Sequence, residues 1–64
     1  MKPLKISWAA ARVNAGKTQR DVASYMKVSM NTVVAWEKGE QEPRINDAIK
    51  LSEYYGMPLE NIKT

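Results

Sequence analysis

Apolar residues recur along this chain at intervals of three and four. No segment alternates apolar and polar residues as a half-buried strand would. Glycines and prolines divide the chain into short segments at Gly16, Gly39, Pro43, Gly56 and Pro58. The pattern therefore predicts an all-α fold, a compact bundle of five short helices.

The first two helices are expected over residues 4–15 and 18–26. Thr18 and Asp21 have the spacing of a capping box, which marks the start of the second helix. Spacings of three, four and seven place one apolar face on each helix. The residues expected on these faces are Leu4, Trp8, Ala11, Ala15, Val22, Ala23 and Met26.

The remaining three helices follow from their terminal residues. Ser29 is the predicted N-cap of a third helix over residues 30–38, which ends at Gly39. The fourth is expected from about residue 45 to Gly56, and Pro58 suits the first position of a short fifth helix. Their predicted core residues are Val33, Trp36, Ile45, Ala48, Ile49, Ser52, Tyr55, Leu59 and Ile62.

The length of 64 residues allows one domain, expected over residues 1–64. The chain has no cysteine and no histidine, which excludes disulfides, thiol chemistry and the commonest general base and metal ligand. No apolar run has the length of a membrane span or a signal peptide. We expect a cytoplasmic protein that is not an enzyme, with no cofactor, metal ion, membrane or small-molecule substrate.

The positive charge of the chain is concentrated in its first part. Residues 1–38 hold seven lysines and arginines against two acids, whereas residues 39–64 hold three against five. This asymmetry indicates that a polyanion such as a nucleic acid faces the first part.

The third predicted helix has an unusual outer face. Turning by 100° per residue, the side opposite Val33 and Trp36 collects Asn31, Val34, Ala35 and Lys38, with Met30 at its border. An asparagine amide pairs with adenine, and small apolar side chains contact the thymine methyl group, so this face suits base reading. The alternative is an apolar patch that contacts another protein or lies under the chain ends.

The second and third helices carry the run Thr18-Gln19-x-x-Val22-Ala23-x-x-Met26-x-Val28-Ser29-x-x-Thr32-Val33-x-x-Trp36-Glu37-x-Gly39-x-x-x-Pro43. This run resembles the helix-turn-helix of the lambda-type phage repressor and Cro family, also called the XRE family. The resemblance extends from about Trp8 to Ile62. It implies a lambda repressor-like DNA-binding domain whose helix-turn-helix covers about residues 18–38, with the third helix in the major groove.

The resemblance also implies roles for individual residues. The base-reading positions are Met30, Asn31, Thr32 and Ala35. Gln19, Ser29 and Lys38 match positions that contact the DNA backbone. Further candidates for phosphate contact are Lys2, Lys5, Lys17, Arg20, Lys27 and Arg44. Arg12 and Glu37 match a structural ion pair between the first and third helices.

Three features depart from the pattern of the family. Lys17 replaces an apolar residue, so its side chain either snorkels or reaches a phosphate. Lys27 stands where the family places a glycine with left-handed backbone, which predicts strain. Glu40 and Glu42 lie in a loop beside the expected phosphate backbone, and their charge predicts moderate affinity for a monomer.

From these features we expect a bacterial or phage transcriptional regulator that binds a specific double-stranded DNA sequence. Repression is expected rather than activation, and the symmetry of operators in this family predicts a homodimer on DNA. The alternative is a protein-interaction module of the same fold, such as an adaptor, an antirepressor or an antitoxin-like domain.

Overall fold

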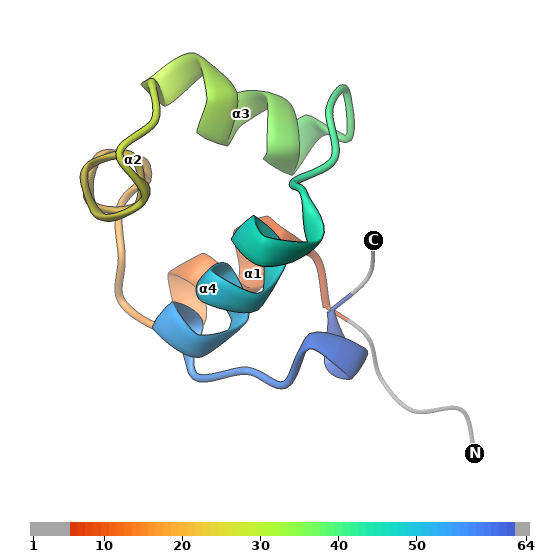
Figure 1. The fold of residues 1–64 in the computed structure, drawn as a ribbon. Coiled ribbons are helices and arrows are strands. Elements are labelled where there is room, and N and C mark those ends of the chain that lie inside the picture. The colour runs from red at the N-terminus through yellow and green to blue at the C-terminus, as the bar shows by residue number, and fades with distance from the viewer. Residues whose placement is uncertain (1–5, 63–64) are drawn as a thin grey trace.

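The computed structural model describes residues 6–62, and this part of the chain is helical without strands (Figure 1). Its elements are α1 (Trp8–Asn14), α2 (Gln19–Met26), α3 (Met30–Lys38), α4 (Ile45–Tyr55) and the 3-10 helix η1 (Leu59–Asn61). The all-helical prediction is therefore confirmed. The predicted number of five α-helices is wrong, because the last element is a single 3-10 turn.

The helix α1 begins later than the sequence predicted. Ser7 is its N-cap, and the Ser7 hydroxyl accepts a hydrogen bond of 3.1 Å from the Ala10 N–H. Ile6 lies in an isolated parallel bridge with Ile62, and its N–H donates to the Asn61 carbonyl at 3.0 Å. This pairing needs extended backbone at Ile6, so the helix cannot include that residue. The predicted core residue Leu4 lies outside the described residues.

The caps of α2 and α3 are those predicted from the sequence. Thr18 and Asp21 form a reciprocal capping box at the start of α2. This bonding with Thr18 lowers the pKa of the Asp21 carboxyl, chiefly through the Thr18 N–H that donates to it. The Ser29 hydroxyl accepts the Thr32 N–H at 3.2 Å, and α3 ends at Gly39 with left-handed backbone. Local side-chain chemistry therefore determines both ends of the segment that carries α2 and α3.

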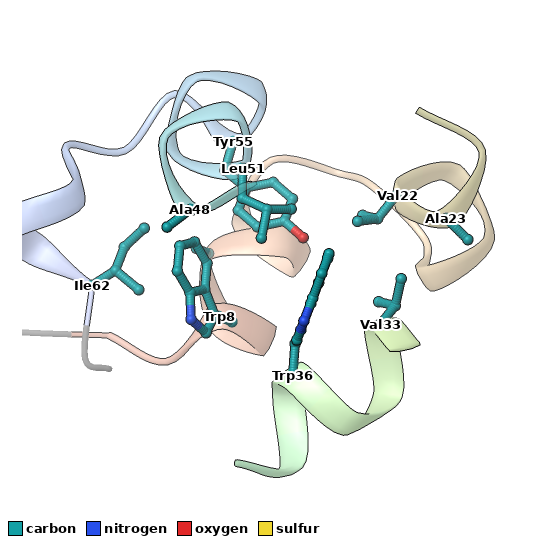
Figure 2. Close-up of a cluster of buried hydrophobic side chains, with 10 residues drawn as sticks. Trp8, Val22, Ala23, Val33, Trp36, Ala48, Leu51, Tyr55 and Ile62 are labelled. Carbon is teal, nitrogen blue, oxygen red and sulfur yellow. The ribbon is translucent and has the colours of Figure 1, made fainter. Parts of the chain in front are cut away.

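The core is built around two tryptophans (Figure 2). Trp8 from α1 and Trp36 from α3 are each 5% exposed, and the Trp8 ring meets Tyr55 of α4 with ring centroids 6.3 Å apart. Figure 2 shows the tryptophan rings in the centre, with Ile62 on one side and Val22 and Val33 on the other. The core thus joins all four helices to Ile62, the last of the described residues.

The buried face of α4 differs from the predicted one. Ala48, Leu51, Ser52 and Tyr55 are buried, whereas Ile45 and Ile49 are 66% and 43% exposed. The two isoleucines lie at the edge of the buried face. The prediction from helical periodicity assigned them to the core and left out Leu51, which is buried. The assignment of Ile45 and Ile49 to the inner face is therefore wrong.

The end of the described chain is a 3-10 turn. Pro58 precedes η1 as its N-cap, and Ile62 returns to extended backbone at once to pair with Ile6. Only three residues lie between Pro58 and the extended residue Ile62, which is too few for an α-helix with its i to i+4 hydrogen bonds. None of the helices in residues 6–62 is long and apolar enough to cross a membrane.

The buried Tyr55 phenol should make the domain less stable at alkaline pH. Burial, aided by the carboxylate of Glu37, raises the pKa of Tyr55 to about 12, compared with about 10 in an unfolded chain. Between these values the unfolded chain binds fewer protons than the folded domain, so stability falls as pH rises. We expect this phenol to account for about 1 kcal/mol of loss at pH 11, and for on the order of 2–3 kcal/mol above both pKa values.

Urea unfolding measured from neutral pH to about pH 11 checks this expectation. Tyr55→Phe serves as the comparison, because it removes this phenol and keeps the aromatic ring and the rest of the chain. The Phe variant should lose less stability over the same range. Parallel curves for the two proteins would contradict the assignment.

Candidate DNA-binding site

The helices α2 and α3 form a helix-turn-helix. In Figure 1, α2 is seen end-on beside α3, which lies along the outer edge of the domain. The turn contains Lys27, which has left-handed backbone with φ 58° and ψ 44°, as the resemblance predicted. The Val28 N–H then closes the turn by donating to the Ala23 carbonyl at 3.0 Å.

The outer face of α3 is available to a ligand. Met30 is 42% exposed, Asn31 and Lys38 are exposed, and Val34 and Ala35 are half-buried. The opposite side is anchored in the core by Val33 and Trp36. This arrangement gives the helix a fixed position while its polar and small apolar groups remain accessible.

Two hydroxyl groups at the start of α3 bond to each other. The Ser29 and Thr32 hydroxyl oxygens are 3.0 Å apart, and the Ser29 hydroxyl also accepts the Thr32 N–H. Thr32 is half-buried and Ser29 is exposed. The Thr32 hydroxyl is thus engaged within the helix, unlike the Asn31 amide, for which the described residues provide no partner.

A hydrogen-bonded network of three side chains joins α1, the start of α2 and the end of α3. The Arg12 Nε donates to the Glu37 Oε2 at 2.7 Å, which forms the ion pair that the resemblance implied. The Gln19 Nε2 donates to the other oxygen, Glu37 Oε1, at 2.9 Å. Arg12 Nη1 also donates to the Lys17 carbonyl at 2.9 Å. One glutamate from α3 therefore holds the end of α1 and the first residue of α2.

This network determines how Gln19 can act. A glutamine amide has two N–H donors and one acceptor oxygen. The bond to Glu37 uses one N–H, so the second N–H remains for another acceptor, such as a phosphate oxygen. The family resemblance implied the Arg12 and Glu37 pair but not the bond between Gln19 and Glu37, because it assigned Gln19 to the DNA backbone alone.

The side chain of Lys17 lies against α4. Its Nζ is 4.9 Å from the centre of the Tyr54 ring, and Tyr54 stacks on Tyr25 with ring centroids 3.9 Å apart. The structure therefore shows Lys17 in a cation–π contact rather than extended into solvent. Sequence reasoning missed both tyrosines, because their stacking depends on the packing of α2 against α4.

Most of the predicted phosphate-contacting cations are exposed. Arg20, Lys27, Lys38 and Arg44 lie on the surface without an ion pair inside residues 6–62. They come from α2, the turn, the end of α3 and the N-cap of α4. Glu40 and Glu42 are exposed in the loop after α3. The predicted contacts of Lys2 and Lys5 lie outside the described residues.

Within residues 6–62, no three side chains among Asp, Glu, His and Cys gather as a metal site would require.

A family model described as helix-turn-helix matches residues 9–62. The chain is 40% identical over 48 residues to the cryptic phage CTXphi transcriptional repressor RstR of Vibrio cholerae, covering 75% of this chain and 43% of that protein. It is 38% identical over 45 residues to an uncharacterized helix-turn-helix-type transcriptional regulator of Methanocaldococcus jannaschii, covering 70% of this chain and 68% of that protein. No solved structure matches the chain at a significant level. The match over nearly the whole described fold shows that this chain belongs to the XRE-type helix-turn-helix family.

Proposed function

We propose that this protein is a transcriptional regulator, and a repressor, that binds a specific sequence of double-stranded DNA. The observation that carries the proposal is the exposed face of α3, which presents Asn31 beside small apolar groups while its other face is fixed in the core. Similarity to a phage repressor and to a second regulator supports it. The matched region covers 43% of the first relative, the phage repressor. Repression by this chain is therefore proposed and is not transferred from that relative.

In this proposal α3 enters the major groove and α2 crosses the backbone. Met30, Asn31, Thr32 and Ala35 contact base edges. The second N–H of Gln19 donates to a phosphate oxygen, and Ser29 contacts the backbone at the start of α3. The remaining phosphate contacts come from Arg20, Lys27, Lys38 and Arg44, and from Lys17 once its Nζ leaves the Tyr54 ring.

The protein is proposed to be a regulator of bacterial or phage type. We propose that residues 1–64 act as a single domain, as a homodimer on DNA, in the cytoplasm and at the nucleoid. Two-fold symmetry would place the second copy on a half-site about one helical turn away, roughly 34 Å along the duplex. The domain would catalyse no reaction and use no cofactor, metal ion or small-molecule substrate.

The dependence of DNA affinity on salt tests the proposal. Each phosphate that a protein neutralises releases counterions, so affinity falls with salt with a slope of about 0.9 per contact. Two contacts already predict a loss of about tenfold between 50 and 200 mM salt, and more contacts predict a steeper loss. Titration of a random-sequence duplex pool and of a selected site measures this slope. No duplex binding at low salt, or a flat dependence, would contradict the proposal.

One observation favours a second candidate, a protein-interaction module. Ile45 and Ile49 are exposed four residues apart on α4, and Ile45 lines a groove together with Pro43 and Leu59. Isolated exposed apolar residues are common, whereas a contiguous apolar surface indicates a contact with another protein. Weak salt dependence together with binding of a protein would favour this candidate.

Replacing Lys27 by glycine should stabilise the domain and weaken its binding to DNA. A non-glycine residue with left-handed backbone is strained by about 1 kcal/mol, and glycine removes that strain. The gain is smaller than this, because glycine also increases the entropy of the unfolded chain. We expect a rise in melting temperature of a few degrees, and a salt slope lower by up to about one unit.

Lys27→Ala separates the two effects. Alanine removes the ammonium group but keeps the Cβ that causes strain, so the salt slope should fall without a rise in melting temperature. A lower melting temperature for Lys27→Gly would contradict the strain. An unchanged slope in both variants would remove Lys27 from the phosphate contacts.

A further inference from the structure

The first two turns of α3 expose no charged side chain. Residues 30–35 read Met-Asn-Thr-Val-Val-Ala, and Asn31 is the residue among them with an exposed amide. The cations nearest to this stretch in the sequence are Lys27, in the preceding turn, and Lys38, at the end of the helix. With a rise of 1.5 Å per residue, Lys38 lies about 12 Å along the axis from Met30.

This composition matters because each base edge needs a different partner. Guanine presents two acceptors in the major groove, which arginine or lysine reads, and the cytosine amino group is read by a carboxylate. Adenine presents an acceptor and a donor side by side, which matches the amide of asparagine. Thymine presents a methyl group, which packs on apolar side chains. The middle of the α3 face thus lacks the readers of a G·C pair and has those of an A·T pair.

The hydroxyl groups nearby do not change this conclusion. Hydroxyls contact several bases and carry little discrimination between them. The Thr32 hydroxyl is bonded to the Ser29 hydroxyl at 3.0 Å, and Thr32 is half-buried. Asn31 therefore remains the principal polar reader in this part of the helix.

The apolar side chains around Asn31 are placed to meet methyl groups. Met30 is 42% exposed at the first position of the helix, and Ala35 lies one turn beyond Asn31 on the same face. One turn of helix covers 5.4 Å, close to the spacing of one to two base pairs at about 3.4 Å each. Apolar contacts can therefore fall on bases next to the one that Asn31 reads.

We infer that α3 selects a run of A·T base pairs, with the Asn31 amide on an adenine and Met30 and Ala35 on the methyl groups of neighbouring thymines. This inference rests on the proposed function and names the class of duplex that the site takes. The core of each half-site is A·T. Lys27 and Lys38, which contact phosphates in the proposed function, place no such requirement on the base pairs toward its ends.

Thymine-to-uracil replacement provides the direct test, because uracil keeps every hydrogen-bonding group of thymine and lacks only the methyl. Sites are first selected from a random duplex library. Each thymine of the selected core is then replaced in turn, and the flanking thymines serve as controls. The loss expected at contacted core positions is about fourfold per methyl, from about 0.8 kcal/mol for one buried methylene-sized group. The flanking replacements should leave affinity unchanged.

A matched pair of variants connects the loss to α3. In the Met30→Ala protein, replacing the thymine that Met30 contacts by uracil should cause little further loss of affinity. Val13→Ala removes an exposed apolar group from α1, outside the helix-turn-helix, and should preserve the full cost.

The outcomes separate this inference from the proposed function. Selected sites with G·C pairs at the core, or uracil replacements without effect on a duplex that binds with steep salt dependence, would overturn the inference and leave DNA binding intact. Absence of any bound duplex at low salt would overturn both. A selected A·T core with losses of about fourfold at single thymines would support the inference.

Discussion

Arg12→Ala is expected to destabilise the folded domain by about 3 kcal/mol and to affect folding more than contact with DNA. The Arg12 and Glu37 side chains are 16% and 10% exposed, so the substitution leaves a carboxylate largely removed from water without its cation. It also removes the bond that the guanidinium donates to the Lys17 carbonyl. Thermal and urea unfolding of the two proteins measure the difference.

This loss is large compared with the stability of so small a domain. Proteins are stable by roughly 0.05–0.15 kcal/mol per residue, which gives about 3–10 kcal/mol for a chain of 64 residues. A loss of about 3 kcal/mol would leave about 0–7 kcal/mol, so at the lower end of this range much of the variant would be unfolded. DNA binding should be compared at low temperature, where the folded fraction of the variant is known.

The control replaces the ion pair by a neutral pair, Arg12→Met with Glu37→Gln. The glutamine oxygen can still accept the bond from Gln19, and no charge is left without a partner. Buried ion pairs are often replaceable by neutral side chains of similar size, so the double variant should regain part of the stability lost by Arg12→Ala. A double-mutant cycle without coupling between positions 12 and 37 would show that the pair does not hold the helices together.

The features predicted correctly from the sequence are those set by neighbouring residues. Thr18, Ser29, Gly39 and Gly56 bound α2, α3 and α4, because a hydroxyl cap or a left-handed glycine acts within one turn of helix. The left-handed backbone of Lys27 followed from the family pattern of the turn.

The errors arise where distant parts of the chain meet. Ile6 pairs with Ile62, and this contact shortens α1 and limits the last element to a 3-10 turn. Local periodicity holds no information about such a pairing. On α4 the apolar residues cover a wider face than the one that packs against the other helices. Helical periodicity therefore could not distinguish the buried Leu51 from the exposed Ile45.

The candidate site shows the same division. The exposure of Asn31 and Lys38 followed from the turn angle of one helix. The bond from Gln19 to Glu37 joins the start of α2 to the end of α3, and the contact of Lys17 with Tyr54 joins a loop to α4. Both depend on how the helices pack, which spacing along the chain does not specify.

Asn31→Ala and Gln19→Ala are expected to weaken DNA binding in different ways. Asn31 is exposed and has no partner among the described residues, so its amide can pair with a base, and its loss should cost about 1–3 kcal/mol on the preferred site. Binding to unrelated duplexes should hardly change, and discrimination at one base pair should be reduced. Gln19 is proposed to contact a phosphate, so its loss should lower the affinity for all DNA sequences equally.

Competition between a selected duplex and its single-position variants, measured for both proteins at one fixed salt concentration, distinguishes these effects. The Gln19 variant also loses the bond to Glu37, so its unfolding must be measured in parallel, and Gln19→Glu provides no substitute because it brings two carboxylates together. Asn31 has no such internal bond, so Asn31→Ala should unfold like the wild type. An Asn31→Ala protein that loses affinity equally for every duplex would show that this side chain contacts the backbone and reads no base.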